Sequence, residues 1–193
     1  MSKIKQDDYG ICLARTVGTA MIISCHILQF FGNGLAWWLN CGVQLFLGMS
    51  GFIYGQKEVV DTYEFIKKRF VRILKEYYIC ILISLIMYLW FAIEYIDIGG
   101  VIDLLFCSGT IEGLGHLWFI GTILFCYILT PGFSKVLDEC LKKEKYLSHI
   151  SILMSLIILH ILIERIIPHF QAEWIVCYFF GFIIGREKMK GGV

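Results

Sequence analysis

The chain has 193 residues, of which 58% are hydrophobic and 16% aromatic, and its mean hydropathy is +0.73. A chain of this length cannot hide so many apolar side chains in a water-soluble core, so a bilayer has to provide the rest of the burial. The formal net charge of +1 gives no indication of a nucleic-acid partner, and none is expected. With two prolines and no stretch rich in Ser, Gly or Pro, residues 1–193 are expected to form a single domain.

Eight cysteines are spread along the chain. Most of them lie in apolar runs without a CxxC or metal-ligand spacing: Cys12, Cys25, Cys41, Cys80, Cys126 and Cys177. Because free Cys is often simply a small buried residue, we interpret these as packing residues and expect no metal site.

Six apolar segments are each close to the roughly 20 residues that an α-helix needs to cross about 30 Å of hydrocarbon. They are residues 11–32, 36–55, 76–96, 116–134, 149–167 and 172–186. The first is too long for a cleaved signal peptide and has no small-x-small cleavage site, so we retain it as a span. The last two are joined by a tight link at Pro168, and the shorter apolar piece at 101–107 is expected to lie at the surface or to re-enter. The predicted fold is an all-α, polytopic integral membrane helical bundle of about six transmembrane helices.

Lysine and arginine positions predict the orientation, because short loops rich in these residues stay in the cytoplasm. With both termini inside, 15 of the 17 basic residues fall on the cytoplasmic side. Tryptophans near the outer ends of the spans are expected to form an interfacial belt: Trp37, Trp38, Trp90, Trp118 and Trp174. We therefore expect a multi-pass protein of the cytoplasmic (inner) membrane, in contact with membrane lipids.

The first span carries two residues that hydrocarbon tolerates poorly, Arg15 towards its inner end and His26 towards its outer end. Eleven residues turn a helix through three turns plus about 20°, so both side chains project from one face, about 16 Å apart along the axis. Gly18, Thr19 and Gln29 complete a polar stripe, which is expected to face other helices or a water-filled cavity. In the alternative, Arg15 reaches the inner headgroups and His26 is satisfied by a neighbouring carbonyl.

The second span contains small residues, Gly48, Ser50 and Gly51, which let helices approach closely. Its Gln44 can hydrogen-bond across a helix interface. Packing alone would also explain these residues.

Residues 65–75 alternate apolar and basic side chains at helical spacing, which predicts an amphipathic helix on the cytoplasmic surface. The basic cluster formed by Lys68, Arg69 and Arg72 is a candidate for gripping the phosphates of a nucleotide-bearing donor, with Arg pairing in a bidentate way. The alternative is ordinary inside-positive charge beside anionic lipid.

The fourth span opens at His116 and contains Tyr127, eleven residues further on and on the same helix face. His116 is therefore a further candidate site residue. The alternative is that it belongs to the interfacial belt, since Trp118 is close by.

In order and spacing, these motifs resemble the acyltransferase 3 family, integral membrane enzymes that O-acylate sugars of bacterial surface polysaccharides. Arg15 and His26 match the family's Arg-x10-His, and residues 42–52 resemble its Gly-Val-x-Leu-Phe-Phe-x-x-Ser-Gly-Phe. Further similar segments lie at residues 68–73 (Arg-x-x-Arg-Ile), 116–119 (His-Leu-Trp-Phe), 127–131 and 178–186. Gln44 stands where many members carry an acidic residue. The resemblance covers nearly the whole chain.

The resemblance implies transfer of an acyl group, with acetyl-CoA as the expected donor, to a hydroxyl of a lipid-linked or cell-surface glycan of the bacterial cell envelope. In this interpretation His26 is the general base, because a neutral imidazole can take the hydroxyl proton. The phosphates of the donor are assigned to Arg15 and to the basic cluster. His116 would contact the acceptor or support His26.

Family members usually carry about ten spans, so we expect this chain to be the N-terminal part of a longer family fold, or to be joined by a completing chain or a second copy of itself. Two other interpretations stay open. A small transporter or channel would line its pathway with Arg15 and His26. An inactive fragment of an acyltransferase would fold in the membrane without turnover.

Overall fold

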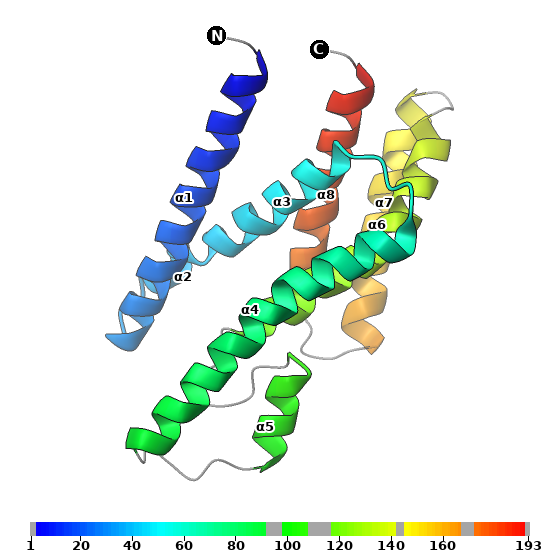
Figure 1. Ribbon diagram of the computed structural model, residues 1–193. Coiled ribbons are helices and arrows are strands. Elements are labelled where there is room, and N and C mark those ends of the chain that lie inside the picture. The colour runs from blue at the N-terminus through cyan, green and yellow to red at the C-terminus, as the bar shows by residue number, and fades with distance from the viewer. Residues whose placement is uncertain (1–2, 92–97, 108–116, 142–144, 167–171, 192–193) are drawn as a thin grey trace. The chain divides into compact units, whose positions relative to one another are not determined.

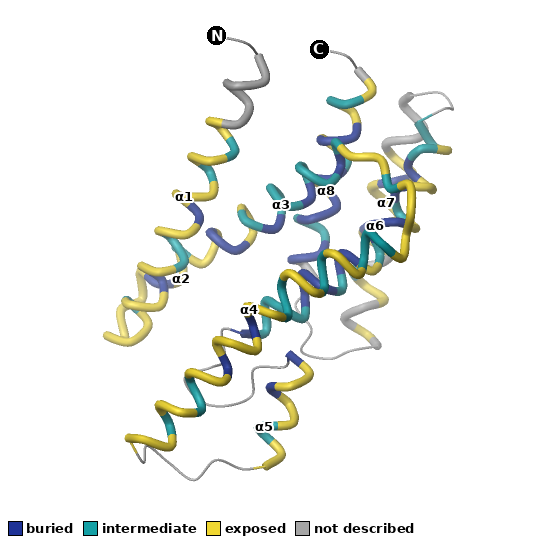
Figure 2. Tube along the Cα trace, in the orientation of Figure 1, coloured by how far each residue is buried: buried dark blue, intermediate teal, exposed yellow. Residues whose placement is uncertain are grey.

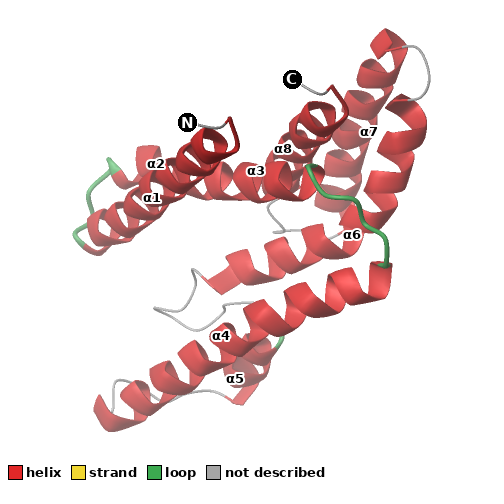
Figure 3. Cartoon of the chain, turned by 45° about the horizontal axis from the view of Figure 1, so that its top comes forward, coloured by secondary structure: helices red, strands yellow, loops and turns green. Residues whose placement is uncertain are grey.

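The computed structural model describes residues 3–91, 98–107, 117–141, 145–166 and 172–191 (Figure 1). Within these ranges the chain forms helices joined by short loops and contains no strand, as Figure 3 shows. The all-α prediction is therefore confirmed. The described helices are α1 (Lys3–Phe30), α2 (Ala36–Leu39), α3 (Cys41–Gly55), α4 (Thr62–Phe91), α5 (Ile98–Leu105), α6 (Trp118–Leu141), α7 (Lys145–Ile166) and α8 (Ala172–Gly191).

These helices belong to two compact units. The first unit holds α1, α2, α3, α7, α8 and the last turns of α6, from Ser134 onwards. The second unit holds α4, α5 and the part of α6 that ends at Phe133.

Among the described residues, two helical stretches are long and apolar enough to cross a membrane, Tyr9–Phe30 in α1 and Trp118–Leu141 in α6. At 1.5 Å per residue they measure about 33 and 36 Å, which matches the thickness of the hydrocarbon core. The number of six spans and the cytoplasmic placement of both termini stay predictions. The link at Pro168 lies outside the described residues.

The predicted second span, 36–55, is divided into two helices. The short helix α2 is followed at Asn40 by a bond between residues three apart, from the Asn40 N–H to the Trp37 carbonyl at 3.4 Å, and α3 begins at Cys41. The fifteen residues of α3 measure about 22 Å, so α3 alone is shorter than the hydrocarbon core.

The predicted surface helix at 65–75 and the predicted third span are one continuous helix, α4. The helix starts where the Asp61 carboxylate accepts a hydrogen bond from the Glu64 N–H at 3.1 Å, the usual role of an N-cap residue. No glycine or proline follows before Phe91, so nothing in the local sequence breaks the helix between its basic first part and its apolar second part.

Close contact between α3 and α8 is built on glycines from both helices. A Cβ atom on Gly51 would overlap the Tyr178 carbonyl, and one on Gly181 would overlap the Gly48 carbonyl. One turn further along, the opposite backbone blocks a side chain at two more positions, Gly55 and Gly185. The predicted close helix approach at Gly48 and Gly51 is confirmed, and the order of the contacts shows that α3 and α8 run parallel.

Helix α8 is the most buried helix of the first unit (Figure 2). Its fully buried side chains follow helical spacing and include Ile175, Tyr178, Phe179 and Phe182. Trp174 is only 3% exposed, so its assignment to a lipid-facing belt is wrong: burial in the protein removes its ring from the membrane surface. Three other tryptophans of that prediction, Trp37, Trp38 and Trp90, are widely exposed.

Helix α1 packs against α3 and α2 through small residues. A Cβ atom on Gly42 would lie 2.9 Å from the Gly18 carbonyl oxygen, and the buried Cys25 thiol donates to the Ala36 carbonyl at 3.2 Å. The two contacts run in opposite order along the chain, so α1 is antiparallel to α2 and α3. The interpretation of Cys25 as a packing residue is confirmed.

In the second unit, the short helix α5 is held against α4 by two tyrosines. The Tyr77 and Tyr78 hydroxyls donate to the carbonyls of Leu104 and Leu105, at 2.6 and 3.1 Å. The last carbonyls of a helix have no partner within it, and these hydroxyls supply one. A buried cluster seals the contact: Tyr77, Ile81, Leu104, Cys107, Leu117 and Leu124. Residues 101–105 of the predicted apolar piece 101–107 are thus the second half of α5, which packs on α4.

Candidate functional site

Helix α1 carries the two predicted site residues on one uninterrupted stretch. Arg15 and His26 lie eleven residues apart within α1, so they project from one face, about 16 Å apart along the axis. Both side chains are exposed in the first unit. Gly18, a member of the polar stripe, is buried against α3. Arg15 and His26, the ionisable residues of the stripe, lie on the exposed side of α1.

Gln29 contacts His26 directly. Its amide oxygen Oε1 lies 3.0 Å from His26 Nδ1. Because an amide oxygen only accepts, the Nδ1–H donates this hydrogen bond, and a neutral imidazole then carries its lone pair on Nε2. The sequence placed Gln29 on the polar stripe without a role, and the three-residue spacing to His26 was the signal for this contact.

The basic cluster lies on the first half of α4, in the second unit. Lys68 and Arg72 are exposed and four residues apart, so they share a helix face. Lys68 Nζ is 3.8 Å from a Glu64 carboxylate oxygen, and the Arg69 guanidinium lies 5.1 Å from the centre of the Phe65 ring. The cluster therefore presents two exposed cations beside a third that stacks on an aromatic ring.

His116 lies outside the described residues. Its partner in the predicted eleven-residue spacing, Tyr127, is buried in α6 and packs edge-on against Phe65 of α4, with ring centres 6.5 Å apart. Tyr127 is therefore a core residue of the second unit.

Arg186 is a charged residue whose burial was not expected from the sequence. It is only 1% exposed, and its Nη2 donates to the Ser134 hydroxyl of α6. Its Nε lies 3.6 Å from Asp138 Oδ1, the same oxygen that Lys190 Nζ approaches to 2.7 Å. Arg186 thus ties the end of α6 to α8. The signal for its burial was helical spacing, because Arg186 continues the series of Tyr178 and Phe182 in steps of four.

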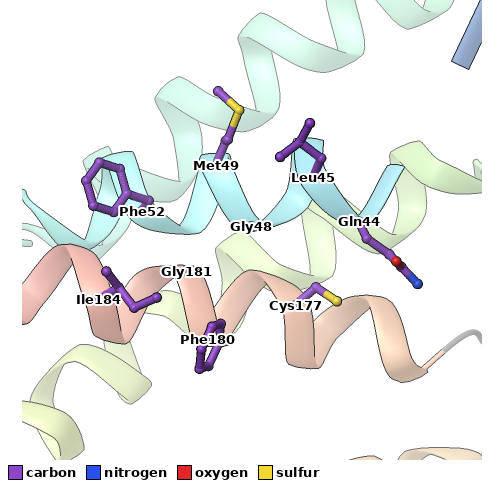
Figure 4. A pocket seen from close by; sticks show the side chains of 9 residues that line it. All are labelled: Gln44, Leu45, Gly48, Met49, Phe52, Cys177, Phe180, Gly181 and Ile184. Atoms are coloured by element: carbon purple, nitrogen blue, oxygen red, sulfur yellow. The ribbon is translucent and has the colours of Figure 1, made fainter. Parts of the chain in front are cut away.

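A groove of about 360 Å³ lies along the contact between α3 and α8 (Figure 4). We call it the α3/α8 groove; its lining residues are Gln44, Leu45, Gly48, Met49 and Phe52 of α3 and Cys177, Phe180, Gly181 and Ile184 of α8. Gln44 and Cys177 lie at one end of the groove, and Phe52 and Ile184 at the other. The lining is almost wholly apolar, so the groove suits a hydrocarbon chain better than a sugar or a nucleotide.

The described helices and the apolar composition define a helical membrane protein. A profile of the acyltransferase domain of the acyltransferase 3 family matches residues 8–191. The match covers nearly the whole chain and both units, so the chain belongs to this family and is an acyltransferase. No curated protein and no solved structure gives a significant match.

Proposed function

We propose that this acyltransferase moves an acyl group, acetyl in the first place, from acyl-CoA to a hydroxyl of a lipid-linked or cell-surface glycan in the inner membrane. The observation that carries the proposal is the family match over residues 8–191, combined with the position of Arg15 and His26 on one face of α1. A base and a cation on the same helix face, about 16 Å apart, suit a long thioester donor whose phosphates and reacting carbon are well separated.

In the proposed reaction, His26 is the general base. Its Nε2 takes the proton of the acceptor hydroxyl while that oxygen attacks the thioester carbonyl. A carbon–oxygen bond forms, the carbon–sulfur bond breaks, and the CoA sulfur leaves with the proton that His26 had taken. The hydrogen bond from Nδ1 to Gln29 supports this role, because it keeps the lone pair on Nε2.

The phosphates of the donor are assigned to Arg15 and to the basic cluster. The residue types fit, because guanidinium groups pair with phosphate in a bidentate way and the exposed ammonium of Lys68 adds a point charge. Glu64 lies beside Lys68 and would have to release it for full pairing. His116 keeps its proposed role at the acceptor or behind His26.

Reconstituted protein given acetyl-CoA with a labelled acetyl group tests the proposal. Label should appear in a glycan acceptor, and His26→Ala should lower the rate by about 10²–10⁴-fold, the usual contribution of a general base. Ser24→Ala is the matched control, because Ser24 is an exposed polar residue on the other side of α1. Label transfer that survives both His26→Ala and Arg15→Ala would contradict the assignment of these residues to the site. Solute flux without CoA release would show that the protein is a transporter and not an enzyme.

A further inference from the structure

The α3/α8 groove is hollow because of the glycines beneath it. Gly48 and Gly181 bring the two backbones into contact and carry no side chains that could fill the crossing. The walls on either side are apolar, and Leu45, Phe180 and Ile184 keep more than a third of their surface exposed. A protein surface of this kind binds an apolar chain that lies along it.

A positive charge marks one end of this groove. Lys188 Nζ lies 5.6 Å from the centre of the Phe52 ring, and Phe52 lines the groove. Lys188 is also four residues after Ile184, so the two share one face of α8. The contact with Phe52 thus places the ammonium group of Lys188 beside the groove end.

An apolar trough that ends at an ammonium group is complementary to a ligand with a hydrocarbon chain and an anionic head. We propose that the α3/α8 groove binds one acyl chain of an anionic phospholipid, whose phosphate lies at Lys188. From Gln44 to Phe52 the groove follows α3 for about 12 Å, enough for a large part of one chain. This site is independent of the acyl-transfer site, since neither Arg15 nor His26 lines it.

Photo-crosslinking of the full chain in phosphatidylcholine vesicles tests this proposal. The probe is phosphatidylglycerol with a diazirine on one acyl chain, and the adducts are mapped by peptide mass spectrometry. We expect adducts on Met49, Phe180 and Ile184 to exceed those on the exposed α1 residues Leu13 and Ile23 several-fold. Ile184→Trp should fill the groove and remove most of this labelling, whereas Ile158→Trp on the exposed side of α7 should leave it unchanged.

Variants of Lys188 test whether this residue binds the phosphate of the lipid head group. Lys188→Gln should lower groove labelling by the phosphatidylglycerol probe several-fold, and Lys188→Arg should preserve it. Lys67→Gln, which removes an exposed cation of the second unit, is the charge control. Helical circular dichroism checks that each variant folds, and Leu45→Trp fills the groove from its other wall should Ile184→Trp misfold.

Three outcomes would overturn the proposal. Equal labelling of the groove and of α1 would mean that the groove contacts only ordinary bilayer lipid and is not a specific lipid site. Equal labelling by phosphatidylglycerol and phosphatidylcholine probes, unchanged by Lys188→Gln, would exclude the anionic head. Protection of the groove from both probes, together with chain-to-chain crosslinks through Phe180, would mean that a second copy occupies it.

Discussion

Arg186 of α8 and Asp138 of α6 form an ion pair, with Nε 3.6 Å from Oδ1, although Arg186 is almost fully buried. Burying a guanidinium is costly unless a carboxylate and further hydrogen bonds accompany it. Asp138 and Ser134 supply both from the same helix, two contacts that hold the end of α6 on α8.

We expect Asp138→Ala to destabilise the first unit, because it leaves Arg186 buried without its carboxylate. Removing one partner of a buried pair costs about 3–5 kcal/mol, and the loss here should lie at or below the lower end because the Asp138 side chain is 33% exposed. The measurement is the Tm in detergent. Glu139→Ala, next along α6 and exposed, should change Tm little. Equal effects of the two variants would contradict the role of the pair, and Arg186→Met should recover part of the loss in the Asp138→Ala background.

Alanine at Gly51 should weaken the packing of α3 on α8. Its Cβ would overlap the Tyr178 carbonyl, and backbone cannot rotate away as a side chain can. Overpacking of this kind costs about 1–3 kcal/mol, seen as a lower Tm. Gly132→Ala in α6 is the matched control, because nothing lies within 4 Å of its added Cβ and alanine favours helix. A Tm for Gly51→Ala at or above that of the unchanged protein would show that α3 and α8 can separate without loss.

Tyr77→Phe should loosen α5 from α4. The buried Leu104 carbonyl would lose the bond from the Tyr77 hydroxyl and keep the one from the Cys107 N–H, so the cost should be about 0.5–1.5 kcal/mol. Amide hydrogen exchange in α5 should become faster. Tyr78→Phe removes the longer and exposed bond to Leu105, where water can replace the hydroxyl, so its effect should be smaller. The reverse order of the two effects would argue against burial as the cause.

Gln29→Leu should lower the kcat of the proposed acyl transfer while leaving KM nearly unchanged, because Gln29 orients His26 without a part in donor binding. The loss should be smaller than for His26→Ala, since the base itself is retained. Gln29→Glu keeps an acceptor oxygen for Nδ1–H and should recover activity. Steady-state kinetics at fixed acceptor concentration measure both. A loss shared equally by Gln29→Leu and Gln29→Glu would assign Gln29 a contact with substrate instead.

Much of the fold could be predicted from local sequence, but the residues at which the helices begin and end were predicted less accurately. The first span and the common face of Arg15 and His26 follow from apolar length and helical period, both of which act within one segment. The fourth span was expected to end at residue 134, yet α6, which contains Pro131, continues to Leu141. Proline removes one hydrogen bond and crowds the preceding turn, and here the helix continues past it because Ser134 and Asp138 beyond it are held by α8.

The sequence by itself determined that the chain is apolar, helical and a member of the acyltransferase 3 family, because composition, hydrophobic period and motif order are properties of neighbouring residues. Only the tertiary structure decided that Arg186 is buried, that Trp174 lies in the core, and that glycines of α3 and α8 leave a groove with Lys188 at its end. These features join residues far apart in the chain. Their energies depend on which distant backbone and which charge come within a few ångströms, and no local pattern contains that distance.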